Sequence, residues 1–182
     1  SNPKGCDHKF WYIRHFQNEH ADDELNADVE RSLRILSHGL GADSPPGTWM
    51  EQLSYPSSKG MLDVLPEPEA LPSWISSEDF EYHVDQFKIN GFRGPTNWYR
   101  NLHNLNSMTP QLEGKRFSQP AAFVAGTDDD VLLYDINWRD WFVEGFEDLR
   151  FLELVDGAAH WLQVEKPHET TALILRFLEE VS

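Results

Sequence analysis

Residues 152–161 read Leu-Glu-Leu-Val-Asp-Gly-Ala-Ala-His-Trp, an apolar run followed by a turn and a histidine. The run ends in Asp156-Gly157, a pair that favours turns, and two small alanines follow. This pattern predicts that His160 lies just beyond the carboxyl end of a buried strand. Open α/β sheets carry their chemistry at that end of their strands, so His160 is a candidate base. A histidine hydrogen-bonded within the core would have the same pattern.

The sequence on either side of this histidine predicts a β-α-β-α segment. Residues 121–125 form a short apolar run ended by a glycine and three aspartates, as expected of a strand buried on both faces. A helix around Trp138 follows, residues 149–155 form the second strand, and Pro167 begins a last helix. The chain therefore ends in a parallel α/β unit.

The residues before this unit predict helices and loops only. Apolar residues recur at helical spacing over residues 22–39, which indicates one helix. Residues 41–71 hold five prolines and no lasting periodicity, so they predict a long loop, a kind of segment that is often functional or mobile. Ser76 caps a further helix that Gly91 ends, and Pro95 opens another in its first turn.

Composition narrows the classes of function. The 182 residues are 40% hydrophobic and carry a net charge of −16, which opposes binding to nucleic acid or to anionic membranes. The single cysteine, Cys6, cannot form an internal disulfide, and no apolar span suggests a signal peptide or a membrane helix, so we expect a reducing, cytoplasmic setting. The start at Ser1-Asn2, without methionine, suggests part of a longer chain. The eight histidines show no metal-binding motif, and no metal is expected.

Three aspartates, residues 128–130, follow the first predicted strand as His160 follows the second. Neighbouring parallel strands would bring these loops together. A carboxylate on one imidazole nitrogen fixes the tautomer and leaves the other nitrogen to act as a base. A solvated acidic loop beside a core histidine is the alternative that the residues leave open.

Four segments of the chain resemble the soluble epoxide hydrolases of the α/β-hydrolase fold. They appear in the same order as in that family and run over nearly the whole sequence. They are Phe10–Gln17 (FWYIRHFQ), Gly91–Asn101 (GFRGPTNWYRN), Ala125–Leu132 (AGTDDDVL) and Gly157–Trp161 (GAAHW). The second segment is highly specific to the family, whereas the last two are shared by many α/β-hydrolases. The resemblance implies a helical lid (cap) domain at residues 1–115 and the carboxy-terminal part of the parallel core at residues 116–182.

The resemblance also implies a two-step reaction without a cofactor. An aspartate attacks a carbon of a small-molecule epoxide to form an alkyl-enzyme ester, and a His-Asp pair activates the water that hydrolyses the ester to a vicinal diol. On matching positions, His160 is the base and Asp129 its orienting acid. Tyr12 and Tyr99 are the donors that stabilise the alkoxide.

Three aromatic residues are candidates for binding the substrate beside these catalytic groups. They are Phe16, Trp98 and Trp161.

One part of the family's machinery is absent from the sequence. The nucleophile elbow and the His-Gly-x-Pro loop of the oxyanion hole belong to the first half of the fold, and neither occurs here. We therefore expect that this chain is inactive alone and that the missing amino-terminal half or a second chain, which could be another copy, completes it.

Two other functions remain open from the sequence. A related α/β-hydrolase such as a haloalkane dehalogenase would use the same Asp-His-Asp catalytic residues but would not need two lid tyrosines. Trp98 and Trp161 are compatible with this function. A catalytically incomplete remnant acting as a binding or dimerisation module is the third hypothesis.

Overall fold

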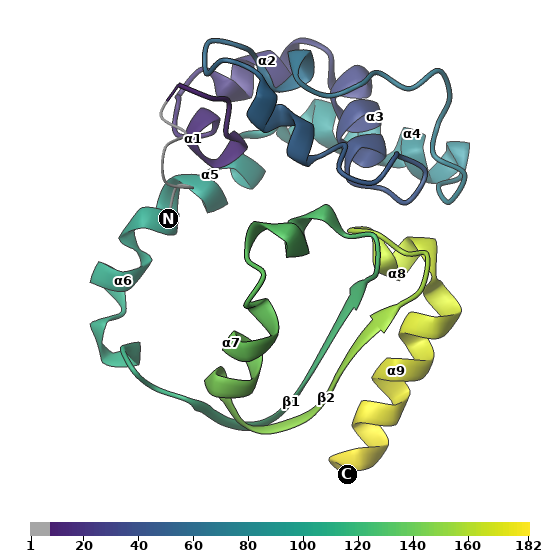
Figure 1. The fold of residues 1–182 in the computed structure, drawn as a ribbon. Coiled ribbons are helices and arrows are strands. Elements are labelled where there is room, and N and C mark those ends of the chain that lie inside the picture. Colours follow the sequence, from purple (N-terminus) through teal and green to yellow (C-terminus); the bar gives the residue numbers. More distant parts are fainter. Residues whose placement is uncertain (1–7) are drawn as a thin grey trace. The chain divides into compact units, whose positions relative to one another are not determined.

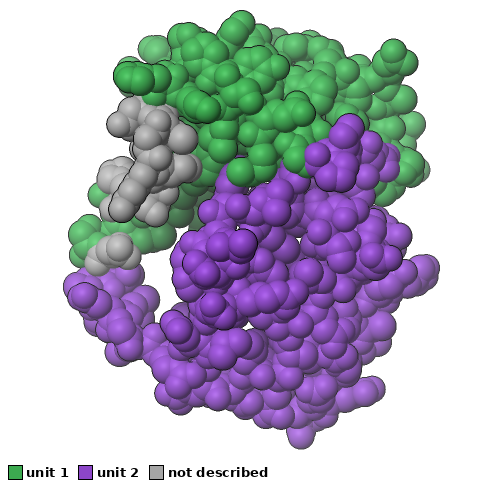
Figure 2. All heavy atoms as spheres, viewed as in Figure 1, with its two compact units in different colours: residues 1–39, 47–108 green, residues 40–46, 109–182 purple. Residues whose placement is uncertain are grey.

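The computed structural model describes residues 8–182, apart from the side chains of His103 and Asn106. These residues form two compact units (Figure 1; Figure 2). Unit 1 comprises residues 8–39 and 47–108, and unit 2 comprises residues 40–46 and 109–182. Cys6 and the Ser1-Asn2 pair, on which the predictions of compartment and processing rest, lie outside the described residues.

Unit 1 is built from helices and turns. Its helices are α1 (Tyr12–His15), α2 (Ala21–Ala27), α3 (Val29–Gly39), α4 (Ser77–Asn90), α5 (Arg93–Asn101) and α6 (Leu105–Met108), and its 3-10 turns are η1 (Met50–Ser54), η2 (Met61–Asp63) and η3 (Leu102–Asn104). As predicted, Ser76 caps α4 by accepting a hydrogen bond from the Asp79 amide at 3.1 Å. Gly91 ends the helix at a positive φ of 68°, which glycine adopts without strain.

The single helix predicted over residues 22–39 is wrong, because the backbone breaks at Asp28. This residue adopts φ −147° and ψ 88°, and its carboxylate accepts a hydrogen bond from the Arg31 amide at 3.0 Å. A side chain that caps a new helix competes with continuation of the old one. The periodicity did not reveal the break because the apolar spacing from Leu25 to Val29 continues across it.

The proline-rich segment contains only short 3-10 turns, yet it supplies much of the core of unit 1. Its buried apolar side chains are Trp49, Met61, Leu62, Val64 and Leu65. Gln52 is also completely buried. The segment is therefore an irregular packing layer, since side chains can fill a core without a regular backbone.

Unit 2 contains the β-α-β-α segment that the sequence predicts. Its elements are η4 (Pro110–Leu112), β1 (Phe117–Gly126), η5 (Asp130–Tyr134), α7 (Trp138–Gly145), β2 (Phe146–Val155), α8 (Leu162–Glu165) and α9 (Pro167–Glu180). The two strands pair in parallel, with Phe123 opposite Leu152 and Gly126 opposite Val155. Their carboxyl ends therefore meet at one edge of the sheet.

Helices α7 and α9 cover opposite faces of these strands (Figure 1). Phe123 of β1 contacts Phe142 of α7, with ring centroids 4.0 Å apart. Phe151 of β2 packs edge-on against Phe177 of α9 at 6.3 Å. In the parallel register Phe151 pairs with Ala122, next to Phe123, so the two aromatic contacts lie on opposite faces.

The first strand is less buried than its sequence predicts. Residues 121–124 are half-buried, and the preceding residues of β1 are exposed. In the described part of the chain, no helix is both long enough and apolar enough to cross a bilayer.

Candidate functional site

The structure brings His160 and Asp129 together beyond the carboxyl ends of β2 and β1. The Nδ1 atom of His160 lies 3.1 Å from Oδ2 and 3.3 Å from Oδ1 of Asp129. An ionised carboxylate only accepts hydrogen bonds, so Nδ1 is the donor, and in the neutral ring this leaves a lone pair on Nε2. The His160 side chain is 38% exposed and that of Asp129 is 11% exposed, so an imidazole within reach of water lies against a shielded carboxylate.

Local backbone geometry selects Asp129 among the three aspartates. Asp129 is the N-cap residue of η5, and its Oδ1 accepts a hydrogen bond from the Val131 amide at 2.9 Å. Asp128 is exposed, and its carboxylate instead accepts a hydrogen bond from the Thr127 hydroxyl at 3.1 Å. The geometric part of the sequence prediction, a His160–Asp129 hydrogen bond at adjacent strand ends, is confirmed, while the catalytic role of the pair stays a prediction.

The loops that carry the two residues are joined along their backbones. The Asp128 amide donates to the Ala158 carbonyl at 2.9 Å, and the Gly157 amide donates to the Thr127 hydroxyl at 3.0 Å. A Cβ atom on Gly126 would lie 2.0 Å from the Ala158 carbonyl oxygen, so only glycine allows this approach. Contacts of the main chain, one of them to the Thr127 hydroxyl, therefore set the relative position of Asp129 and His160.

A cavity of about 570 Å³ in unit 2 lies beside the His-Asp pair. Besides Asp129 and His160, its lining includes the apolar side chains of Phe123, Leu132, Trp138, Trp141 and Phe142. Trp161, one of the predicted substrate-binding residues, packs edge-on against His160 with ring centroids 5.3 Å apart. The pair thus borders an apolar hollow, which would strengthen its hydrogen bond relative to water.

Tyr12 and Tyr99 lie together in unit 1. Their ring centroids are 5.4 Å apart at an interplanar angle of 80°, and Tyr12 packs in the same way on Trp49 at 5.3 Å. Phe16 is buried and contacts both tyrosine rings, at 6.1 Å from Tyr12 and 5.0 Å from Tyr99. Trp98, in contrast, is 77% exposed.

Two glutamine side chains hold the backbone at these tyrosines. Oε1 of the buried Gln52 accepts a hydrogen bond from the Tyr12 amide at 3.1 Å, while its Nε2 donates to the Trp49 carbonyl at 2.7 Å. Nε2 of Gln17 donates to the Tyr99 carbonyl at 2.8 Å. The sequence analysis missed both residues, and no local pattern around Gln52, which follows Glu51 and precedes Leu53, marks it as buried.

Burial raises the pKa of both phenols above the ordinary tyrosine value. Burial and, to a smaller extent, the neighbouring Tyr99 raise the pKa of Tyr12 to about 12. Burial also raises the pKa of Tyr99. The shift therefore favours the protonated phenols, which can donate hydrogen bonds.

A buried ion pair ties α5 to the start of α2 next to Tyr99. Arg100 donates from Nη2 and Nη1 to the two oxygens of Asp22, at 2.9 and 3.0 Å, and Thr96 donates to the same carboxylate at 2.5 Å. Burial alone would raise the pKa of Asp22, but the hydrogen bonds from Arg100 and Thr96 outweigh it and lower the pKa. Nε of Arg100 also donates to the Phe16 carbonyl at 2.9 Å, so one side chain links the aromatic cluster to α5.

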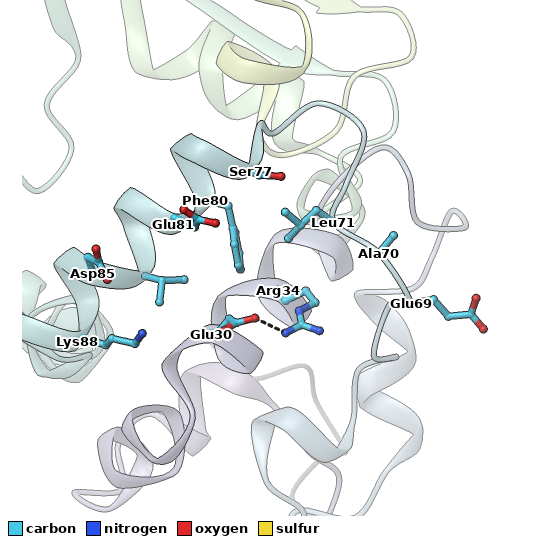
Figure 3. Close-up of a pocket in the computed structure, with 11 residues that line it drawn as sticks. Glu30, Arg34, Glu69, Ala70, Leu71, Ser77, Phe80, Glu81, Asp85 and Lys88 are labelled. Atoms are coloured by element: carbon cyan, nitrogen blue, oxygen red, sulfur yellow. Dashed lines mark hydrogen bonds and ion pairs between the residues drawn. The ribbon is translucent and has the colours of Figure 1, made fainter.

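A second hollow in unit 1, of about 520 Å³, holds none of the predicted site residues (Figure 3). It lies between α3 and α4, with Phe80 among its apolar lining residues and the Glu30–Arg34 ion pair among its charged ones. Across residues 8–182, so far as they are described, no group of three or more His, Cys, Asp or Glu side chains could hold a metal ion.

Comparison with known proteins gives a consistent set of relatives. No protein-family model matches the chain. The chain is 41% identical over 170 residues to Epoxide hydrolase A of Mycobacterium tuberculosis, a match that covers 93% of this chain and 52% of that protein. It superposes on the crystal structure of Epoxide Hydrolase A from Mycobacterium thermoresistibile with a TM-score of 0.86 and 37% identity, covering 97% of this chain and 54% of the other. It is also similar to an epoxide hydrolase from an endophytic Streptomyces, with a TM-score of 0.88, 25% identity and 97% and 53% coverage.

These matches agree with the fold and the family that the sequence motifs imply. The chain spans about half the length of the relatives that it matches. In sequence and in structure it is related to the epoxide hydrolases of the α/β-hydrolase fold.

Proposed function

We propose that this chain carries the water-activating pair and the ring-opening donors of an epoxide hydrolase, and that the nucleophilic aspartate and the oxyanion hole come from outside these 182 residues. The pair is His160 with Asp129, and the donors are Tyr12 and Tyr99. The substrate is a small-molecule epoxide, and the product is a vicinal diol.

In the first step, a carboxylate oxygen of the external aspartate attacks an epoxide carbon, and the bond between that carbon and the ring oxygen breaks. The ring oxygen leaves with the electron pair as an alkoxide. The hydroxyls of Tyr12 and Tyr99 hydrogen-bond to this oxygen, and one of them supplies its proton. Phe16 supports this step by packing against both rings.

In the second step, Nε2 of His160 takes a proton from water, and the resulting hydroxide attacks the ester carbonyl. The ester C–O bond breaks, and the departing alkoxide takes the proton of the new carboxyl group, which releases the diol and regenerates the aspartate carboxylate. The imidazolium then returns its proton, through solvent, to the tyrosinate left by the first step. The Asp129 carboxylate stabilises the imidazolium that forms and keeps the ring in the tautomer that can act as a base.

The observation that carries this proposal is the hydrogen bond from His160 Nδ1 to Asp129, 3.1 Å long, at the carboxyl ends of neighbouring parallel strands. A structural histidine needs a partner, but it does not need an acid fixed by its own backbone hydrogen bond or an apolar hollow beside the ring. The match to epoxide hydrolases over 93% of the chain supports the same reaction.

The test compares epoxide turnover by the 182-residue chain alone with turnover when the amino-terminal half of the fold is supplied. We expect no diol from the chain alone and diol formation from the completed enzyme. In the completed enzyme, His160→Gln should stop ester hydrolysis and trap a covalent adduct, seen by mass spectrometry as a gain equal to the mass of the epoxide. Diol formation by the isolated chain, or an active completed enzyme whose His160→Gln variant traps no adduct, would contradict the proposal.

A further inference from the structure

Glu165, at the end of α8, joins two segments that lie far apart in the sequence. Its carboxylate accepts a hydrogen bond from the Ala159 amide through Oε2 and one from the Ala42 amide through Oε1, the latter at 3.2 Å. Ala159 directly precedes His160, while Ala42 belongs to the short segment 40–46. That segment interrupts the sequence of unit 1 but packs with unit 2.

The same short segment holds His160 directly. The His160 amide donates to the Leu40 carbonyl at 3.1 Å. Ala158 and Ala159 are buried, so their peptide groups depend on partners within the protein. The Ala159 amide thus binds Glu165, and the His160 amide binds segment 40–46. Glu165 also binds that segment, through the Ala42 amide.

From this arrangement we propose that Glu165 is a positioning residue for His160. It clamps segment 40–46 onto the loop 157–160, which sets the direction of the His160 side chain and keeps Nδ1 on Asp129. Both acceptor oxygens are required, because each receives a separate amide. The inference rests on the proposed function only in that it concerns the base of the same site.

Glu165→Gln tests the requirement for two acceptors with almost no change in shape. A glutamine offers one acceptor oxygen and one amide group, so one of the two backbone amides loses its partner and faces another donor. Glu169→Gln is the matched control, since Glu169 is an exposed glutamate in the first turn of α9 and its substitution removes the same charge.

Two measurements on the 182-residue chain report whether Glu165 holds segment 40–46 against loop 157–160, and neither requires epoxide turnover. The first is amide hydrogen exchange at Ala42, Ala159 and His160, which reports local opening. The second is the downfield proton resonance of His160 Nδ1–H, assigned by its loss in Asp129→Asn. We expect Glu165→Gln to accelerate exchange at Ala42 or Ala159 by about tenfold, as loss of one hydrogen bond allows, and to abolish the Nδ1–H resonance. Glu169→Gln should change neither.

Unchanged exchange in Glu165→Gln would overturn the clamp. Faster exchange with an intact Nδ1–H resonance would reduce Glu165 to a structural role and overturn its positioning of His160. If Glu165→Gln loses protection throughout β1 and β2 and is therefore unfolded, Glu165→Asp, which keeps the charge on a shorter side chain, is measured with the same two criteria. Epoxide turnover is measured in a separate assay. The hydrogen-exchange and NMR results therefore test the role of Glu165 even if the proposed reaction does not occur.

Discussion

Asp22→Asn should strongly destabilise unit 1, because it breaks the ion pair that anchors α5. Asp22 is 5% exposed, and the Arg100 side chain that it binds at 2.9 and 3.0 Å is 17% exposed. Loss of one partner from a buried pair costs about 3–5 kcal/mol when the other charge is left alone. Arg100 keeps hydrogen bonds to the Phe16 and Asn18 carbonyls, so we expect about 2–3 kcal/mol.

The assay is urea unfolding of wild type and variants at one protein concentration, since the chain is expected to associate, followed by far-UV circular dichroism, with stability taken from linear extrapolation. Glu30→Gln is the control because its pair with Arg34 is exposed, with 56% and 29% of the two side chains accessible, and it should change stability by less than about 0.5 kcal/mol. An Asp22→Asn loss below about 1 kcal/mol, or one no larger than that of Glu30→Gln, would refute the reasoning.

The pH dependence gives the same prediction a second test. Burial alone would raise the pKa of Asp22, but hydrogen bonds from Arg100 and Thr96 lower it in the folded state. The unfolded carboxyl has a pKa of about 3.9, so the stabilisation is complete above that pH and is lost as the pH falls through the lower folded pKa. The difference in stability between wild type and Asp22→Asn should therefore be constant near neutrality and shrink below about pH 4.

Gly126→Ala should lower the free energy of unfolding by about 1–3 kcal/mol and weaken the His-Asp pair, because the new methyl group would meet the Ala158 carbonyl oxygen. Thermal unfolding measures the effect, and Gly145→Ala, which has open space at its Cβ, should be tolerated in the same assay. In the completed enzyme, Tyr12→Phe and Tyr99→Phe should each slow ester formation by about 10²–10³-fold with the fold intact, and unchanged single-turnover rates in both would refute their role as donors. The isolated chain should associate with another copy or a complementary chain, because residues 117–120 of β1 are exposed and one edge of the strand is unpaired in the described two-stranded sheet. A monodisperse monomer in sedimentation velocity would contradict this.

Local sequence was sufficient to predict those features of the structure that depend on residues close together along the chain. Ser76 and Gly91 mark the ends of α4, and the turn at Asp156-Gly157 marks the end of β2. The order β-α-β-α then follows, and with it the meeting of Asp129 and His160 at one edge of the sheet. These features could be predicted because caps, turns and hydrophobic periodicity act within a few residues.

Features that depend on contacts between distant segments were decided only by the tertiary structure. No local pattern shows that Gln52 binds the Tyr12 amide, that residues 40–46 leave unit 1 to pack with unit 2, or that Glu165 clamps them beside His160. The break at Asp28 was hidden for a related reason, since an apolar period can continue across a change of helix axis. Each of these depends on which donors and acceptors lie within about 3 Å after folding, and the spacing of residues along the chain does not contain that information.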